Sequence, residues 1–143
     1  MGRWVGEGSG QPGQGSGSFS FRFDLQGKIL VRNNRADYPA RQDRPAFSHE
    51  DLMVIYHEGE GMPARAIYFD NEGHVINYAA SASEDGTAWL FVSDPAPSRP
   101  RFRLTYTKEN HGTLAIKFEI APPGQPDSFS PYIEAKARRQ GEP

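Results

Sequence analysis

Polar-tipped rings stand among apolar residues in several segments of this chain. Histidine and tyrosine rings in such positions offer an apolar wall together with one hydrogen-bond donor or acceptor, which suits the binding of a small organic molecule. The residues concerned are Tyr56, His57, Tyr68, His74, Tyr78, Tyr106 and Tyr132. Because rings of this kind orient a ligand without requiring a reaction, they favour a binding site over a catalytic one.

One segment places two of these rings on the same face. His74, Ile76, Tyr78 and Ala80 alternate, and alternate residues of a strand share one side. If that side faces a cavity, His74 and Tyr78 lie about 13 Å apart and contact opposite ends of one ligand. The catalytic alternative is an isomerase, cyclase or hydratase with His74 or His57 as general base and Tyr78 as acid. The structural alternative is that the His74 ring lies at a solvent-exposed rim of the fold and that Tyr78 serves only for packing.

Many other chemistries are excluded by the residues that are missing. The chain of 143 residues has no cysteine, so disulfides, thiolate nucleophiles and cysteine-ligated metals are ruled out. Its histidines, at positions 49, 57, 74 and 111, lack metal-ligand spacing, and we expect His49 and His111 in loops or turns. Serine-hydrolase and nucleotide-binding motifs are missing too. The net charge of −2 argues against nucleic-acid and membrane partners.

Short β-rich segments separated by turn residues must position these groups. They recur every ten to twelve residues or so, which is typical of a sandwich or barrel. The expected strands are Arg3–Glu7, Ser18–Leu25, Lys28–Ala36, Leu52–His57, Ala64–Phe69, His74–Ala80, Thr87–Val92, Arg101–Thr107, Thr113–Ile120 and Pro131–Arg139. Irregular loops are expected at 8–17, 37–48, 94–100 and 121–130, with a frayed tail at 140–143. The 37–48 segment could form a lid, and Ser48 to Asp51 resembles a helix cap.

An isolated meander of ten strands would leave two long edges open to aggregation, so we expect the sheet to close. The prediction is therefore an all-β protein, a single closed antiparallel meander barrel over residues 1–143. A barrel of eight to ten strands leaves an interior wide enough for one small ligand. The alternating sets Phe19, Phe21, Phe23 and Leu114, Ile116, Phe118 are expected to line it.

The two ends of the chain resemble the calycins. Gly2-Arg3-Trp4 is similar to the Gly-x-Trp opening of that superfamily, and Arg138-Arg139 ends the last expected strand, where calycins carry a basic residue. The resemblance implies that Arg138 or Arg139 packs across Trp4 and closes the barrel base, a cation–π contact worth about 0.5–2 kcal/mol.

More narrowly, the opening Gly2 to Gly8 and the closing Tyr132 to Arg139 resemble nitrobindin-like haem barrels and related lipocalin-like domains. In nitrobindins the closing strand carries the histidine that binds haem iron, and Tyr132 stands at that position here. Tyrosine can ligate ferric haem, although a phenol lining a barrel more often donates a hydrogen bond to an organic ligand. By resemblance to fatty-acid-binding barrels, Arg32 or Arg103 with Tyr132 could hold a carboxylate; alternatively both arginines face water.

The leading hypothesis is a protein that binds a small hydrophobic or amphipathic molecule inside the barrel. Its ligand-binding candidates are Tyr132, Tyr56, Tyr68, Tyr78, His74, Arg32 and Arg103. The enzyme described above is the alternative, and a haem protein is a third possibility; no metal and no other cofactor is expected. The N-terminus lacks the order of a secretory signal, so we expect a cytoplasmic protein, with a homodimer through an uncovered strand as an open option.

Overall fold

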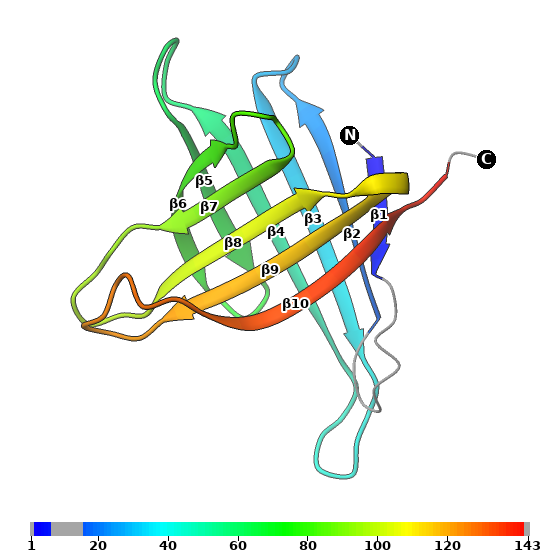
Figure 1. Cartoon of the computed structure of the whole chain (residues 1–143). Coiled ribbons are helices and arrows are strands. Elements are labelled where there is room, and N and C mark those ends of the chain that lie inside the picture. Colours follow the sequence, from blue (N-terminus) through cyan, green and yellow to red (C-terminus); the bar gives the residue numbers. More distant parts are fainter. Residues whose placement is uncertain (1, 7–15, 142–143) are drawn as a thin grey trace.

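Ten antiparallel strands in a closed ring make up the fold. The computed structural model describes residues 2–6 and 16–141. The strands are β1 (Gly2–Gly6), β2 (Ser16–Asp24), β3 (Ile29–Tyr38), β4 (Phe47–His57), β5 (Ala64–Asp70), β6 (Val75–Ala82), β7 (Ala88–Ser93), β8 (Arg101–Lys108), β9 (Thr113–Ala121) and β10 (Ser130–Arg139). Each pairs with the next, and β1 also pairs with β10 (Figure 1). The predicted all-β meander barrel is confirmed.

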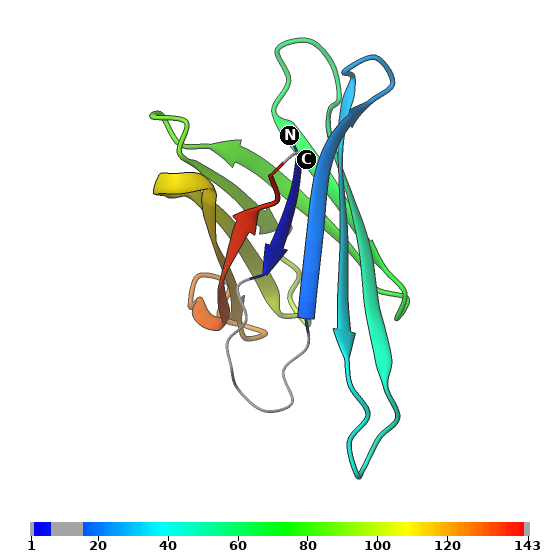
Figure 2. The same ribbon diagram turned by 90° about the vertical axis from the view of Figure 1, so that its right-hand side faces the viewer.

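The barrel has two unlike ends. Short turns at 25–28, 58–63, 83–87 and 109–112 lie at one, which we call the turn end. Segments 39–46, 71–74, 94–100 and 122–129 lie at the other, which we call the loop end. The 39–46 segment projects beyond the barrel in both views (Figures 1 and 2). The 3₁₀ turn at 110–112 is the only helical segment of the described residues, none of which forms a helix long and apolar enough to cross a membrane.

Inward-facing side chains fill the middle of the barrel. The predicted inward faces of β2 and β9 are confirmed by the register, although Phe23 at the turn end of β2 is 59% exposed. The face of β6 that carries Ile76, Tyr78 and Ala80 also points inward. The buried cluster consists of Phe19, Met53, Ala66, Tyr78, Phe91, Leu104, Tyr106, Leu114 and Ala137. Met53 and Tyr78 are no more than 2% exposed. The middle is thus a packed core.

The base of the barrel closes where β1, β2 and β10 meet. Trp4 stacks on Phe19, with ring centroids 5.7 Å apart, and the guanidinium of Arg139 lies 6.0 Å from the Trp4 ring centroid. Gly2 adopts a φ of +127°, and a Cβ there would stand 3.1 Å from Nε of Arg139. Glycine is needed at this position because it tolerates that backbone and lets the arginine approach. Arg138 faces outward on the same strand.

Three expectations about elements need correction. Ser48 to Asp51 does not cap a helix, because β4 begins at Phe47 and these residues pair with β3. The irregular segment before β4 is therefore limited to 39–46. Gln140 is not frayed, since its backbone N–H donates to the carbonyl of Arg3 at 2.8 Å. Glu7, most of the 8–17 loop, the last two residues and the side chain of His111 lie outside what the structure describes.

Candidate functional site

A buried ion pair anchors the polar part of the barrel interior. Arg32 on β3 and Asp51 on β4 both point inward, and their side chains are only 7% and 3% exposed. Arg32 donates hydrogen bonds to the carboxylate of Asp51 and to the hydroxyl of Tyr106. Nε of Arg32 has no hydrogen-bond partner among the described residues. Two charges can stay in such a core only because each is paired and hydrogen-bonded.

From Asp51 the polar network runs toward the loop end. Asn34 donates to one carboxylate oxygen of Asp51 at 2.8 Å, and Nε2 of His49 lies 3.0 Å from the same oxygen. Nδ1 of His49 lies 3.1 Å from a carboxylate oxygen of Glu72, in the turn between β5 and β6. The His49 side chain is 24% exposed, so it stands where the network meets solvent.

A second carboxylate, Asp70, organises the neighbouring turn. It accepts a hydrogen bond from the Tyr68 hydroxyl at 3.1 Å and lies 2.9 Å from Nδ1 of His74. The backbone N–H groups of Glu72 and His74 also donate to it, which holds the turn closed. The Tyr68 hydroxyl is 3.3 Å from Nε2 of His49, so the two carboxylate clusters meet at these two rings.

The network shifts the pKa values of its members. Partial burial alone would lower the pKa of His49, but the hydrogen bond with Glu72 and the charge of Asp51 outweigh it and raise that pKa. Burial, with the charges of Asp51 and Asp70, raises the pKa of Tyr68. Burial would raise the pKa of Asp70, but hydrogen bonds from His74 and Tyr68 lower it. His49 therefore tends toward the charged form and Tyr68 toward the neutral one.

At the same end of the barrel, the inner surface opposite this network is apolar and aromatic. Strands β8 to β10 lie halfway round the ring of strands from β3 to β5. Phe102 stacks on Phe118 at a centroid distance of 5.7 Å, and Phe118 meets Tyr132 edge-on at 6.3 Å. Tyr132 is 69% exposed and Ile133 is 50% exposed, beside a β-bulge. The inner surface at the loop end thus has one polar side, at His49 and Tyr68, and one aromatic side, at Phe102 and Phe118; we call this partly exposed surface the loop-end opening.

Only some of the predicted ligand-binding residues face the interior. Tyr68 and Arg32 belong to the network, Tyr78 is buried in the core, and His74 is exposed at the loop-end rim. His57 lies at the turn end, where its Nδ1 is 2.9 Å from the carbonyl of Met62. Because β4 and β6 place His57 and His74 at opposite ends of the barrel, the two cannot serve one site.

Tyr56 and Arg103 do not face the barrel interior; for Arg103 the structure has the outward alternative. Register places both on the outer face, since Tyr56 pairs with Ile29 and Arg65, and Arg103 with Glu119. Arg103 forms two 2.8 Å hydrogen bonds with Glu119 and stands 4.2 Å above the ring of Phe129. A carboxylate partner on the next strand therefore occupies Arg103. No such pairing across strands is visible before the strands are aligned.

Sequence reasoning missed His49, Asp51 and Asn34. His49 was expected in a loop, and the segment from Ser48 to Asp51 resembled a helix cap. The signal that could have found it is the alternation of His49, Asp51, Met53 and Ile55, which continues the inward face of β4. In this alternating set the inward face of β4 changes from apolar at Met53 and Ile55 to polar at His49 and Asp51, toward the loop end.

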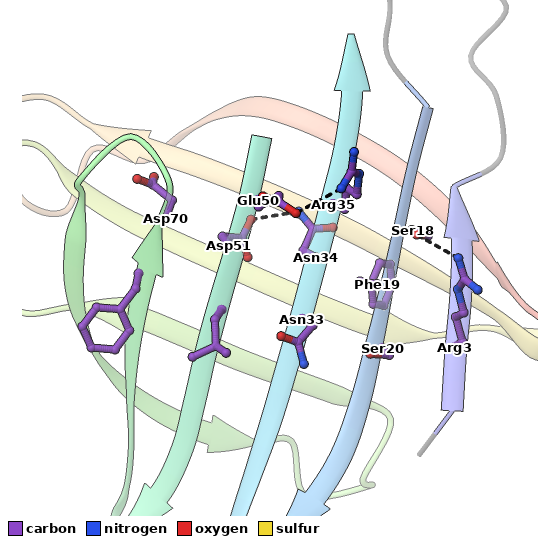
Figure 3. Close-up of a pocket in the computed structure, with 12 residues that line it drawn as sticks. Arg3, Ser18, Phe19, Ser20, Asn33, Asn34, Arg35, Glu50, Asp51 and Asp70 are labelled. Carbon is purple, nitrogen blue, oxygen red and sulfur yellow. Dashed lines mark hydrogen bonds and ion pairs between the residues drawn. The ribbon is translucent and has the colours of Figure 1, made fainter. Parts of the chain in front are cut away.

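The outer face of the same strands carries a groove of about 430 Å³. Figure 3 shows it crossing β1 to β5, with Arg3, Ser20 and Asn33 along one side and Ser18, Arg35 and Glu50 along the other. Leu52 and Phe69 continue the first side. The backbone of Phe19, Asn34, Asp51 and Asp70 lies between the two rows, so the floor of this outer groove is the back of the interior network.

A smaller pocket of about 290 Å³ lies among the proline-rich loops at 95–101 and 122–126. Neither pocket includes a residue of the aromatic wall. The described residues contain no cluster of three or more side chains able to hold a metal ion. Haem does not fit the Tyr132 site either, because this ring stands at an exposed bulge against Phe118 and the core beyond is filled.

Comparisons with known proteins add no family assignment. The chain matches no family model, and no curated protein matches it. The closed ten-strand meander is consistent with a calycin-like fold. Functional inference therefore depends on the site itself.

Proposed function

We propose that the protein binds a small amphipathic organic molecule in the loop-end opening of its barrel. The observation that carries this proposal is the division of that inner surface into a polar side around His49 and Tyr68 and an aromatic side around Phe102 and Phe118. A ligand with one polar group and an aromatic or aliphatic body would satisfy both sides at once.

Depth and exposure support this placement. Tyr68, Phe102 and Phe118 point inward, yet each retains partial solvent exposure, whereas Met53 and Tyr78 deeper in the barrel do not. A ligand acceptor that reaches Nε of Arg32 would also satisfy this buried donor, whose unmet hydrogen bond costs about 1–3 kcal/mol. The ligand would rest on the packed core rather than pass through the barrel.

Native mass spectrometry of the purified protein would first show whether an organic molecule is retained. Titration with 2-naphthol, an aromatic molecule with one hydroxyl, would follow, read by amide chemical shifts. We expect shifts at β4, β5, β8 and β9 near the loop end. Tyr68→Phe should weaken binding about five- to tenfold through loss of one hydrogen bond.

Tyr56→Phe is the matched control, because the same hydroxyl is removed from the outer face of the adjacent strand. If neither 2-naphthol nor a co-purifying molecule shifts the loop-end amides, the proposal is wrong. Equal effects of the two tyrosine variants would also contradict it.

Acid–base catalysis is the second candidate, and one contact favours it. His49 lies within 3.3 Å of the Tyr68 hydroxyl and 3.0 Å of Asp51, so a histidine, a phenol and a carboxylate meet at a solvent-accessible opening. The residues differ from the predicted His74, His57 and Tyr78. Turnover that is abolished in His49→Gln while 2-naphthol binding persists would establish an enzyme; binding with no turnover of any bound compound would leave a binding protein.

A further inference from the structure

The outer groove is crossed by an unbroken row of directly paired residues. Arg3 pairs with Ser20, Ser20 with Asn33, and Asn33 with Leu52. The row continues from Leu52 to Phe69 and from Phe69 to Val75 on β6. Six neighbouring strands therefore align one row of side chains, over about 24 Å at ordinary strand spacing.

The chemical character of this row changes along its length. It begins with a guanidinium at Arg3, continues through a hydroxyl and an amide, and ends in three apolar side chains. Phe69 is 42% exposed and Val75 is 55% exposed. The side chains of Ser20 and Asn33 are half-buried and have no hydrogen-bond partner among the described residues. Donors without partners thus lie beside the cation, and exposed apolar surface lies at the far end.

The charged side chains of the opposite row are engaged with one another and with Asp37. Arg35 donates to Asp37 at 3.1 Å, to Ser48 at 3.2 Å and to Glu50 at 3.1 Å, so its Nε and both terminal nitrogens are engaged. Arg3 instead donates to the Ser18 hydroxyl at 3.5 Å, and no carboxylate of the described residues pairs with it. Among the described residues that line the groove, Arg3 at the β1 end is therefore the cation without a carboxylate partner.

We propose that this groove binds an elongated amphipathic organic anion. The anionic head would lie at Arg3, with Ser20 and Asn33 as further hydrogen-bond donors, and the apolar tail would lie along Leu52, Phe69 and Val75. Charge-assisted hydrogen bonds supply the selectivity for the head, and burial of the exposed apolar side chains favours the tail. The site is separate from the barrel opening, since the β3 and β4 backbone lies between them.

Dodecanoate, used below the concentration at which it forms micelles, is the probe. Binding would be measured by calorimetry and mapped by amide chemical shifts, with dodecan-1-ol and dodecyltrimethylammonium as neutral and cationic matches. We expect shifts along the outer row from β1 to β6 and clearly weaker binding of the other two compounds. Arg3→Gln should weaken dodecanoate binding about tenfold, and Phe69→Thr severalfold.

Arg22→Gln is the matched charge control, because Arg22 lies outside the groove and pairs with Asp24 at 2.7 Å. Circular dichroism would verify that each variant folds. The proposal would be overturned if Arg3→Gln and Arg22→Gln bound dodecanoate equally well. It would also be overturned if dodecyltrimethylammonium bound as tightly as dodecanoate, or if dodecanoate did not bind. Amide shifts confined to His49 and Tyr68 would assign dodecanoate to the loop-end opening and would also overturn the proposal. Tyr68→Phe, which tests the loop-end opening, should leave dodecanoate binding in the groove unchanged.

Discussion

Strands β3 and β4 carry two ion pairs on opposite faces, and the pairs differ in burial. Arg32 and Asp51 point inward and are 7% and 3% exposed, whereas Arg35 and Glu50 point outward and are 56% and 55% exposed. The chemistry of the two pairs is the same. On the inner face, the arginine–carboxylate pair is part of the core, and neither charge can lose its partner without a large cost in stability. On the outer face, the pair lies in solvent beside the groove and contributes little to stability.

Both faces are also linked to a candidate site. The inner pair continues through His49 and Tyr68 to the loop-end opening, while the outer pair neutralises one side of the groove. A ligand in the opening therefore meets a network that folding has already arranged. A ligand in the groove meets exposed surface side chains, so its affinity depends more on its own charge and apolar length.

The largest effect should come from breaking the inner pair. Asp51→Ala leaves the Arg32 cation buried without its carboxylate, and we expect a loss of about 3–5 kcal/mol in the free energy of unfolding, measured with urea. The double variant Arg32→Met with Asp51→Leu should recover most of that loss, because no charge is then buried. A loss no larger than that of Glu50→Ala would contradict the distinction between the two faces.

Removing the third member of the inner cluster should have an intermediate effect. Tyr106→Phe keeps the ring, which packs against Phe19 and Phe91, but deprives Arg32 of its hydroxyl partner. We expect urea unfolding to show a loss of about 1–3 kcal/mol. Tyr56→Phe, on the outer face of β4, should leave stability nearly unchanged and serves as the control.

His49, at the solvent-exposed edge of the network, should make the free energy of unfolding depend on pH. The pKa of His49 is raised in the folded protein, so its protonated form contributes stability that is complete below the ordinary histidine pKa of about 6.5. That contribution is lost as the pH rises through the raised pKa. Unfolding at a series of pH values should therefore show the wild type weakening across this window relative to His49→Gln. Parallel profiles for the two proteins would refute the linkage.

The smallest effect is expected on the outer face. Arg35→Gln removes an exposed cation that pairs with Asp37 and Glu50, and such pairs contribute about 0–1 kcal/mol. Any loss should shrink further in high salt, because screening acts on exposed charges. A salt-independent loss comparable to that of Asp51→Ala would show that the outer pair is also structural.

Alternation and turn residues in the sequence were enough to predict the barrel. Phe19, Phe21 and Phe23, and likewise Leu114, Ile116 and Phe118, repeat with the period of a strand that has one buried face. Their local spacing determines which side turns inward, and the number of strands makes closure favourable. The Gly-x-Trp opening and the terminal arginines also pointed to the base, where Trp4 meets Arg139.

Local spacing does not determine which residues meet across strands. Arg32 and Tyr106 are 74 positions apart, and the row from Arg3 to Val75 is drawn from six strands. Register decides these contacts, because a slip of one residue would exchange the inner and outer faces. The sequence by itself determined the closed all-β fold and the inward apolar faces. Only the tertiary structure decided that Arg32 is paired inside, that Arg103 lies outside, and that His49 joins the two carboxylate clusters.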